Sequence, residues 1–364
     1  MKQLLQEILH NKLLWLLIFV PIVLVAAKVN HDAHTMLFGL SVLAIVPLAA
    51  LLSHATESVA AKTGDAVGGL LNATLGNLTE LVIAITALAA GQYMLVKASI
   101  AGVIVTNALF MLGASFLLGG LKHRTQEYNS STARMQASLL FLATIAMLIP
   151  SAISQADFVG GANFTTTLSL GLAILLIVTY ALGMLFQLKT HKDQFASSAH
   201  HGEDETPLPM GVALATLAAV TVLVAMVSHV FVESVQVAAE SMGMTQAFVG
   251  FIVVALVGGA AEMVAAFSGA RKNRMDLSVG IALGSATQIA LFVGPLLVLL
   301  SYVIGPMPMD LQFWPGAVVM ILIASLTAAL VTNSGKSAWF VGVLLLMVYL
   351  VFAMTLYLLP PRVQ

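Results

Sequence analysis

Long apolar segments recur along the whole chain of 364 residues, and they restrict its fold more than any other feature. A helix needs about 20 predominantly apolar residues to cross the hydrocarbon core of a bilayer, and these runs approach that length. Hydrophobic residues make up 60% of the sequence and charged residues only 9%, which leaves too little polar surface to cover a soluble globule. The sequence therefore predicts an all-α integral membrane protein.

Glycine, proline and charged clusters divide the apolar runs into eleven predicted spans. They lie near residues 13–27, 35–53, 66–90, 95–120, 134–153, 163–187, 210–232, 246–270, 277–303, 312–333 and 338–359. The first run lacks a small-residue cleavage site followed by a soluble domain. We therefore expect a retained helix rather than a signal peptide.

The charges in the connecting loops test this division. Counted from the N-terminus, twelve of the fifteen Lys and Arg residues fall on one side of the membrane, and Lys28, Lys97 and Arg362 fall on the other. A miscounted span would disturb this alternation, and Lys and Arg collect on the cytoplasmic side of short loops. We expect a multi-pass protein of the cell membrane (plasma or inner membrane) with a cytoplasmic N-terminus.

The most polar internal segment, KTHKDQFASSAHHGEDETPLP at 189–209, separates the sixth and seventh spans. Its acidic cluster is typical of a solvated linker, and a regulatory cation site is the alternative. Because the chain has no cysteine, disulfides and thiolate metal sites are excluded. The net charge of −1 argues against a nucleic-acid partner.

The two halves of the chain contain a repeated motif. VGGLLNATLGNLTE from Val67 aligns without gaps with VGFIVVALVGGAAE from Val249, at a constant offset of 182 residues. The matching pairs are Gly68 with Gly250, Ala73 with Ala255, Gly76 with Gly258, Glu80 with Glu262 and Gly102 with Gly284. When a slip of one residue is allowed, a carboxamide follows in each half, Asn107 and Gln288. This agreement indicates two related units.

Five predicted crossings separate Glu80 from Glu262, and an odd number inverts the second unit relative to the first. Inverted repeats build secondary transporters whose substrate site lies near the bilayer midplane. We expect the polar segment at 189–209 to be an acidic, His-rich cytoplasmic linker between the two units.

Glu80 and Glu262 are the main candidate functional residues. A carboxylate at membrane depth is costly, so each should face a partner, a cavity or an ion. The glycine-containing steps at 76–77 and 258–259 lie one turn before the glutamates. Such steps can break a helix and open its backbone carbonyls to a ligand. Hydrogen bonding between helices is the alternative role for the two glutamates.

Together these residues compose an all-oxygen site. The carboxylates of Glu80 and Glu262 would be joined by the carboxamide oxygens of Asn77, Asn107 and Gln288. Such donors suit hard cations, and Ca2+ accepts an irregular oxygen shell more readily than Mg2+ does. Two close carboxylates repel each other, so without metal the site should hold protons on Glu80 and Glu262. Competition between cation and protons is the simplest basis for antiport.

Five motifs give the chain a family resemblance. They are ATES at 55–58, GGLLNATLGNLTELVIA at 68–84, FLLGGLKHRTQEYN at 116–129, GGAAE at 258–262 and MDLSVGIALGSATQIALFV at 275–293. With them the chain resembles the calcium/proton exchanger (CAX) family of the calcium:cation antiporter superfamily. The resemblance implies an extra N-terminal transmembrane helix at 1–30 before two inverted five-helix repeats, at 31–188 and 210–364. It also implies exchange of Ca2+ or another divalent cation for H+ by alternating access. It also implies that Glu80 and Glu262 bind Ca2+ and protons, with Asn107 and Gln288 as the equivalent carboxamides of the following helices.

The sequence departs from the family pattern near the site. The family usually has Asn and His where Gly259 and Met263 stand, and a serine where Val103 stands. Ser285 keeps that serine in the second half. Sodium/calcium exchangers of the same superfamily tend to carry a further acidic residue where Gln288 stands, so protons are favoured over sodium as the counter-ion.

Further residues can line the cation path or surround the site: Glu57, Asn72, Gly76, Gly258, Gly259, Ser285, His229 and Glu233. Glu57 has a second interpretation, in which it only ends the second span at the membrane surface. Asn107 and Gln288 also have one, because carboxamides commonly bridge membrane helices without touching substrate.

We expect a transporter rather than an enzyme. Its substrates would be Ca2+ and protons and its environment the lipid bilayer, with no cofactor and no nucleic-acid partner; whether it forms a homo-oligomer stays open. The alternatives are a Na+/Ca2+-type exchanger, a cation channel with acidic residues in its pore and, more remotely, an intramembrane protease that uses the two carboxylates as an acid–base pair. Counter-transport distinguishes an exchanger from the channel and the protease.

Overall fold

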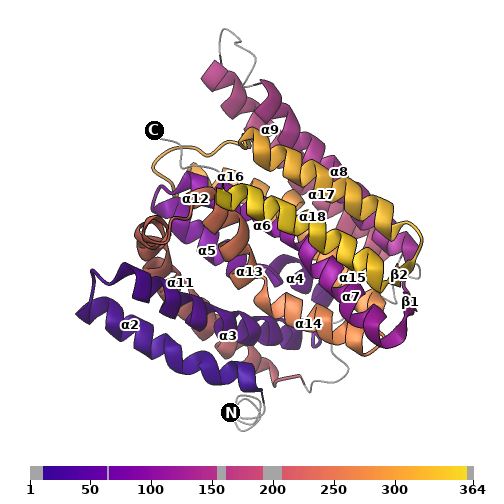
Figure 1. Ribbon diagram of the computed structural model, residues 1–364, viewed down its shortest axis with the longest axis horizontal. Helices are drawn as coiled ribbons and strands as arrows, with labels where there is room; N and C mark the ends of the chain where they lie inside the picture. The colour runs from indigo at the N-terminus through magenta and orange to yellow at the C-terminus, as the bar shows by residue number, and fades with distance from the viewer. Residues whose placement is uncertain (1–10, 64, 154–160, 192–206, 359–364) are drawn as a thin grey trace.

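The structure is a computed structural model that describes residues 11–63, 65–153, 161–191 and 207–358. Within these ranges it is nearly all helical (Figure 1). The first half contains η1 (Lys12–Ile18), α2 (Phe19–Val29), α3 (His34–Ala60), α4 (Asp65–Leu75), α5 (Leu78–Ala89), α6 (Tyr93–Val105), η2 (Thr106–Met111), α7 (Leu112–His123), β1 (Thr125–Glu127), α8 (Ser130–Ile153), α9 (Gly161–Leu185) and η3 (Phe186–Thr190). The second half contains α11 (Met210–Ser241), α12 (Gln246–Phe248), η5 (Val249–Val254), α13 (Ala255–Gly258), α14 (Ala260–Arg271), α15 (Met275–Gln288), η6 (Ile289–Val293), α16 (Gly294–Ser301), α17 (Pro315–Thr332), β2 (Lys336–Ala338) and α18 (Trp339–Leu358). The two short strands pair antiparallel.

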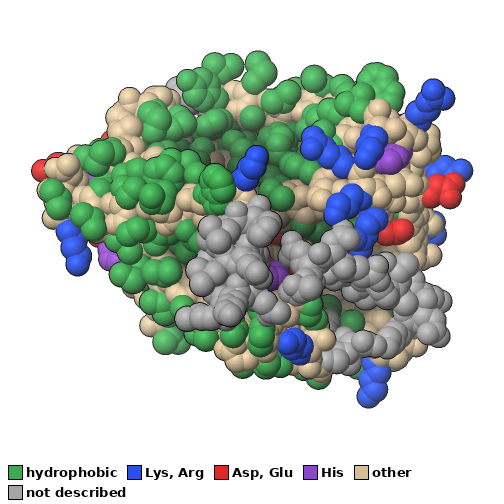
Figure 2. All heavy atoms as spheres, turned by 90° about the horizontal axis from the view of Figure 1, so that it is seen from below, with side chains coloured by type: hydrophobic (Ala, Val, Ile, Leu, Met, Phe, Trp, Pro, Cys, Tyr) green, Lys and Arg blue, Asp and Glu red, His purple; other side chains and the backbone are tan. Residues whose placement is uncertain are grey.

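The described residues form nine helices that are long and apolar enough to cross a membrane, and a bent pair, Gln246–Gly258 with Ala260–Arg271, makes up to ten. The segment expected near 66–90 forms two shorter helices, α4 of 11 residues and α5 of 12 residues. Hydrophobic side chains spread over much of the face in Figure 2, while Lys and Arg gather toward one side. The α-helical, multi-pass membrane architecture is confirmed, and the count of eleven spans stays a prediction.

The two halves repeat the same succession of elements. α5 and α14 have 12 residues each, and their boundaries differ by the 182 residues found in the sequence repeat. Each is followed by a residue in the left-handed region, Gly91 (φ 72°) and Asn273 (φ 61°), a conformation that commonly ends helices. α6 and α15 then continue through the π-helical segments η2 and η6 into α7 and α16. The repeat is thus present in the backbone.

The halves pack in an exchanged pattern (Figure 1). α7 of the first half contacts α18 of the second, and its counterpart α16 contacts α9 of the first. The equivalent helices α3 and α11 contact each other, and so do α8 and α17. Equivalent helices of the two halves thus pair reciprocally. This pairing leaves the broken helices, α4–α5 and α13–α14, between the halves.

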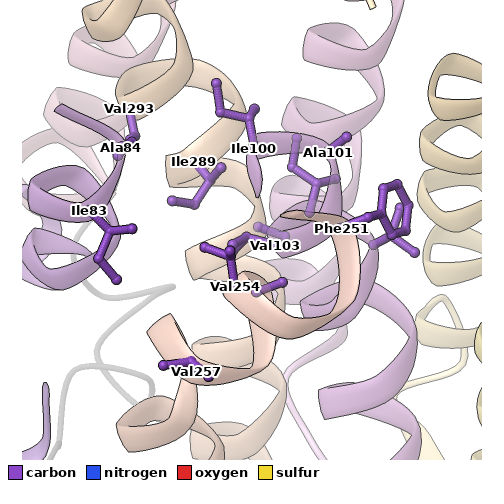
Figure 3. Packing of buried hydrophobic residues seen from close by; sticks show 14 of the residues in the cluster. Ile83, Ala84, Ile100, Ala101, Val103, Phe251, Val254, Val257, Ile289 and Val293 are labelled. Carbon is purple, nitrogen blue, oxygen red and sulfur yellow. The ribbon is translucent and has the colours of Figure 1, made fainter. Parts of the chain in front are cut away.

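Close helix crossings hold this central region together. A Cβ atom at Gly102 of α6 would lie 2.2 Å from the Phe251 carbonyl oxygen, and one at Gly250 would lie 2.5 Å from the Ala98 Cβ. These glycines let α6 and η5 approach closely, as small residues do between membrane helices. Figure 3 shows the apolar side chains packed here from α5, α6, η5, α13 and η6. Because both halves contribute, this core positions the two helix breaks relative to each other.

Candidate cation-binding site

Two broken helices position the carboxylates. α13 ends at Gly258, α14 begins at Ala260, and the axis bends by 60° between them. In the first half, Gly76 and Asn77 form the turn that separates α4 from α5. Glu80 and Glu262 are each the third residue of the helix that follows the break. The N-terminus of a helix carries a partial positive charge, so both carboxylates occupy favourable positions.

The first-half carboxylate packs against the second-half break. A Cβ atom at Gly258 would lie 3.0 Å from Glu80 Cγ and 3.5 Å from Glu80 Oε1, and Glu80 is only 8% exposed. Glu262 interacts electrostatically with Glu80 and, more weakly, with Glu57. The structure therefore brings together the two glutamates that the repeat placed in equivalent positions.

A chain of hydrogen bonds joins the polar residues around the carboxylates. The Asn107 Nδ2 donates to Ser285 Oγ at 2.9 Å, Ser285 Oγ donates to Asn77 Oδ1 at 2.7 Å, and Asn77 Nδ2 donates to Gln288 Oε1 at 2.5 Å. All four side chains are buried. Ser285 is also within hydrogen-bonding reach of the Glu262 carboxyl. Asn107 and Gln288 thus do bridge helices, as their second interpretation states.

Three oxygens at this site are buried and without a hydrogen-bond partner in the described part of the chain: Glu80 Oε1, Glu262 Oε2 and Asn107 Oδ1. Buried polar atoms in folded proteins nearly always have a partner. Unsatisfied oxygens on two carboxylates and one carboxamide suit a hard cation. The oxygens of Asn77 and Gln288, by contrast, already accept hydrogen bonds.

The two breaks differ in one respect. Asn77 is the residue immediately before α5, and the residue immediately before α14 is Gly259, which has no side chain. A Cβ atom at Gly259 would lie 3.8 Å from Asn107 Oδ1. Likewise, a Cβ atom at Gly76 would lie 3.8 Å from Gln288 Oε1. Both breaks therefore face the carboxamide from the other half of the molecule.

The remaining candidates take different positions. Glu57 lies on α3 and accepts a hydrogen bond from Ser53 at 3.2 Å. Asn72 is partly buried on α4, and its carbonyl accepts the Gly76 N–H at 2.8 Å. On α11, His229 Nδ1 lies 3.4 Å from Glu233 Oε1, with side chains 68% and 50% exposed. The described contacts of His229 and Glu233 do not connect them to the central site.

The acidity of the site comes from few groups. Among the described residues, no cluster of three or more His, Cys, Asp or Glu side chains is arranged to hold a metal ion. The site therefore has two carboxylates with neutral oxygens around them, which fits an ion that must be released as well as bound. Most of the acidic linker, residues 192–206, lies outside the described residues. The regulatory cation site that is its alternative role therefore stays a prediction.

The π-helical segments beside the site were not predicted from the sequence. Asn107 is the second residue of η2, and Gln288 is the last residue of α15 before η6. In η2, Thr106 Oγ1 donates to the Tyr349 hydroxyl of α18 at 3.2 Å. π-helical turns are frequent at functional sites because they reorient side chains within a helix. Apolar sequence around them offers no signal that would predict them.

Comparisons with known proteins agree with this architecture. The family model described as "Sodium/calcium exchanger protein" matches residues 33–189 and 212–358. A "Ca(2+)/H(+) antiporter" of Aphanothece halophytica is 41% identical over 359 residues, covering 95% of this chain and 96% of its own. The "Ca(2+)/H(+) antiporter ChaA" of Bacillus subtilis is 38% identical over 355 residues, covering 96% of this chain and 100% of its own. Among solved structures, native YfkE superimposes with a TM-score of 0.83 at 36% identity, covering 96% of this chain and 100% of its own.

Proposed function

We propose, from the premise that the chain belongs to the sodium/calcium exchanger protein family, that it is a secondary antiporter exchanging Ca2+ for H+. The observation that carries the proposal is the group of three buried oxygens without partners, two of them on carboxylates from the two broken helices. Relatives described as Ca2+/H+ antiporters, similar along nearly the whole chain, support the choice of ions.

Charge explains how one site can carry both substrates. Ionised Glu80 and Glu262 carry two negative charges, and either one Ca2+ or two protons neutralises them. A neutral, loaded site can change its access from one side of the membrane to the other. An empty, ionised pair buried at membrane depth is costly. Return of the empty carrier is thereby suppressed, and the movement of Ca2+ is coupled to that of protons.

The neutral oxygens favour Ca2+ among hard cations. Asn107 Oδ1 adds a carboxamide oxygen to the two carboxylates, and backbone carbonyls at the helix breaks can add more. Ca2+ takes six to eight oxygens in irregular geometry, whereas Mg2+ requires a near-octahedral shell. A sodium/calcium exchanger is less well supported, because Gln288 stands where a further carboxylate would be needed and no third carboxylate completes a cluster in the described chain.

We place the protein in the cell membrane with a cytoplasmic N-terminus, on the strength of the loop charges. The two repeats would then present their equivalent breaks from opposite sides of the bilayer. The transporter assignment also makes enzymatic catalysis and a resident cofactor unnecessary for the activity.

Transport by the purified full-length chain in proteoliposomes tests the proposal. The vesicles contain a calcium-sensitive dye, and Ca2+ is added outside. Three conditions are compared: an outward proton gradient (interior acidic), no gradient, and an outward sodium gradient. We expect dye signal with the pH gradient, abolished by a protonophore and absent from protein-free vesicles. Ca2+ flux that needs no opposing gradient would indicate a channel, and flux driven by sodium alone would indicate a sodium/calcium exchanger. The absence of any flux, with the protein inserted, would contradict transport.

A further inference from the structure

We infer that Ser285 is a positioning residue that turns the Asn107 carboxamide so that its Oδ1 faces the cation, and that Asn77 and Gln288 hold Ser285 in place instead of binding the ion. This inference rests on the proposed function. It makes the donor set asymmetric, with Glu80, Glu262 and Asn107 in direct contact with the ion.

The hydrogen bonds around Ser285 run in one direction. Asn107 donates to Ser285, Ser285 donates to Asn77, and Asn77 donates to Gln288. A chain of this kind has two different ends. At one end the acceptor Asn107 Oδ1 has no partner, and at the other the donor Gln288 Nε2 has none, within the described residues. A cation is attracted to the acceptor end only.

The serine hydroxyl sets this direction because it has a single hydrogen. That hydrogen is directed to Asn77 Oδ1 at 2.7 Å. Toward Asn107, Ser285 Oγ can therefore only accept. The carboxamide of Asn107 must therefore present Nδ2 to the serine and Oδ1 to the opposite side. An alanine at position 285 would remove this selection and leave the carboxamide free to turn its N–H groups toward the cation.

Asn77 and Gln288 continue the hydrogen-bond chain from Ser285, on the side away from Asn107. The Asn77 side chain uses Oδ1 to accept from Ser285 and Nδ2 to donate to Gln288 Oε1. Both oxygens are thereby occupied. Within the described part of the chain, the unsatisfied atom that Gln288 contributes is the amide nitrogen Nε2, which cannot coordinate a cation.

The positions that the repeat makes equivalent to Asn77 and Ser285 cannot form the same hydrogen bonds. At the repeat offset of 182, Gly259 corresponds to Asn77 and Val103 to Ser285. Neither residue has a polar side chain. Nothing from the break at Gly259 competes for the Asn107 oxygen, which lies 3.8 Å from the Cβ position of that glycine. The repeat therefore predicts a symmetric site, while the side chains leave one carboxamide oxygen free and the other occupied.

A double-mutant cycle on the full-length protein tests the inference. The half-saturating Ca2+ concentration of proton-driven uptake is measured in proteoliposomes for the wild type, Ser285→Ala, Asn107→Ala and the double variant. We expect each single variant to raise it about tenfold, as for one lost neutral oxygen ligand. The double variant should be no worse than Asn107→Ala, because Ser285 acts through Asn107. Maximal rates should change much less than the half-saturating concentration.

Two further variants separate positioning from general structure. Ser285→Thr keeps the hydroxyl and should restore most of the affinity. Ser278→Ala, on the same helix, removes a hydroxyl that donates to the Ala266 carbonyl and takes no part in the hydrogen bonds around Ser285. It should leave the Ca2+ affinity unchanged. The same double-mutant cycle is repeated by measuring equilibrium binding of Ca2+ to detergent-solubilised variants, without transport. If Ser285→Ala does not fold, the affinity of Ser285→Thr still tests the role of the hydroxyl.

The results distinguish the inference from the proposed function. Losses that add in the double variant, or an unchanged affinity in Ser285→Ala, would overturn the positioning role while leaving Ca2+/H+ exchange intact. A wild-type protein that shows no proton-driven uptake would overturn the proposed function itself.

Discussion

Gly258 and Glu80 come from opposite halves of the chain, and a Cβ atom at Gly258 would lie 3.0 Å from Glu80 Cγ. The absence of a side chain at Gly258 thus makes room for the carboxylate of the other repeat. This contact links the helix break in one half to the carboxylate of the other half. A substitution at the Gly258 break should therefore also displace the Glu80 carboxylate.

Replacing Gly258 by Ala should move Glu80. The added methyl group would be tighter against Cγ than ordinary van der Waals contact allows, so the carboxylate must shift, and we expect the initial rate of Ca2+ uptake to fall about tenfold or more. Gly280→Ala is the matched control, since no heavy atom lies within 4 Å of its Cβ position. Equal uptake by the two variants would argue against close packing of Glu80 on the break.

Glu80→Gln and Glu262→Gln should each abolish exchange. Each substitution keeps the shape of the side chain but removes half of the charge that holds the divalent cation, and it removes a proton-binding group. The measurement is Ca2+ uptake driven by a pH gradient, with membrane insertion verified by detergent extraction and size-exclusion chromatography. Substantial uptake by either variant would reject a shared site for Ca2+ and protons.

Asn107→Ala and Gln288→Ala should differ in effect. Loss of the Asn107 oxygen should raise the half-saturating Ca2+ concentration, because removing a buried neutral partner costs about 1–3 kcal/mol. Gln288→Ala should raise the half-saturating Ca2+ concentration less, because the Gln288 oxygen already accepts a hydrogen bond from Asn77. Ca2+ titrations of uptake compare the two variants directly. A larger effect at Gln288 would assign the ligand to that carboxamide instead.

The apparent affinity for Ca2+ should fall as the pH is lowered. Metal ligands must be deprotonated to bind, so each proton that Ca2+ displaces should weaken the apparent affinity by about tenfold per pH unit over the range in which the carboxylates are protonated. Linkage requires the same number of protons to be released on Ca2+ binding. Ca2+ titrations in weak buffer with a pH-sensitive dye measure both quantities. An affinity that does not change with pH, together with no proton release, would turn attention to the channel alternative.

Gly102→Ala should destabilise the protein through packing alone. Its Cβ would lie 2.2 Å from the Phe251 carbonyl oxygen, so α6 and η5 must separate, at a cost of about 1–3 kcal/mol. Gly171→Ala on α9, where nothing lies within 4 Å, serves as the control. The thermal unfolding midpoint in detergent should fall for the first variant and stay constant for the second; identical midpoints would mean that the crossing relaxes without cost.

The sequence by itself determined the membrane character, most of the helical segments and the pair Glu80 and Glu262. These features depend on local quantities: the transfer free energy of each residue, the length of each apolar run and a repeat that can be aligned letter by letter. The tertiary structure decided which oxygens of the predicted donor set are free. Asn77, Asn107 and Gln288 are all carboxamides, and composition cannot rank them. Which of these carboxamide oxygens is free follows from the hydrogen bonds around Ser285, which join side chains from the turn before α5, from η2 and from α15. The same applies to the π-helical segments η2 and η6, which the apolar sequence around them does not distinguish from ordinary α-helix.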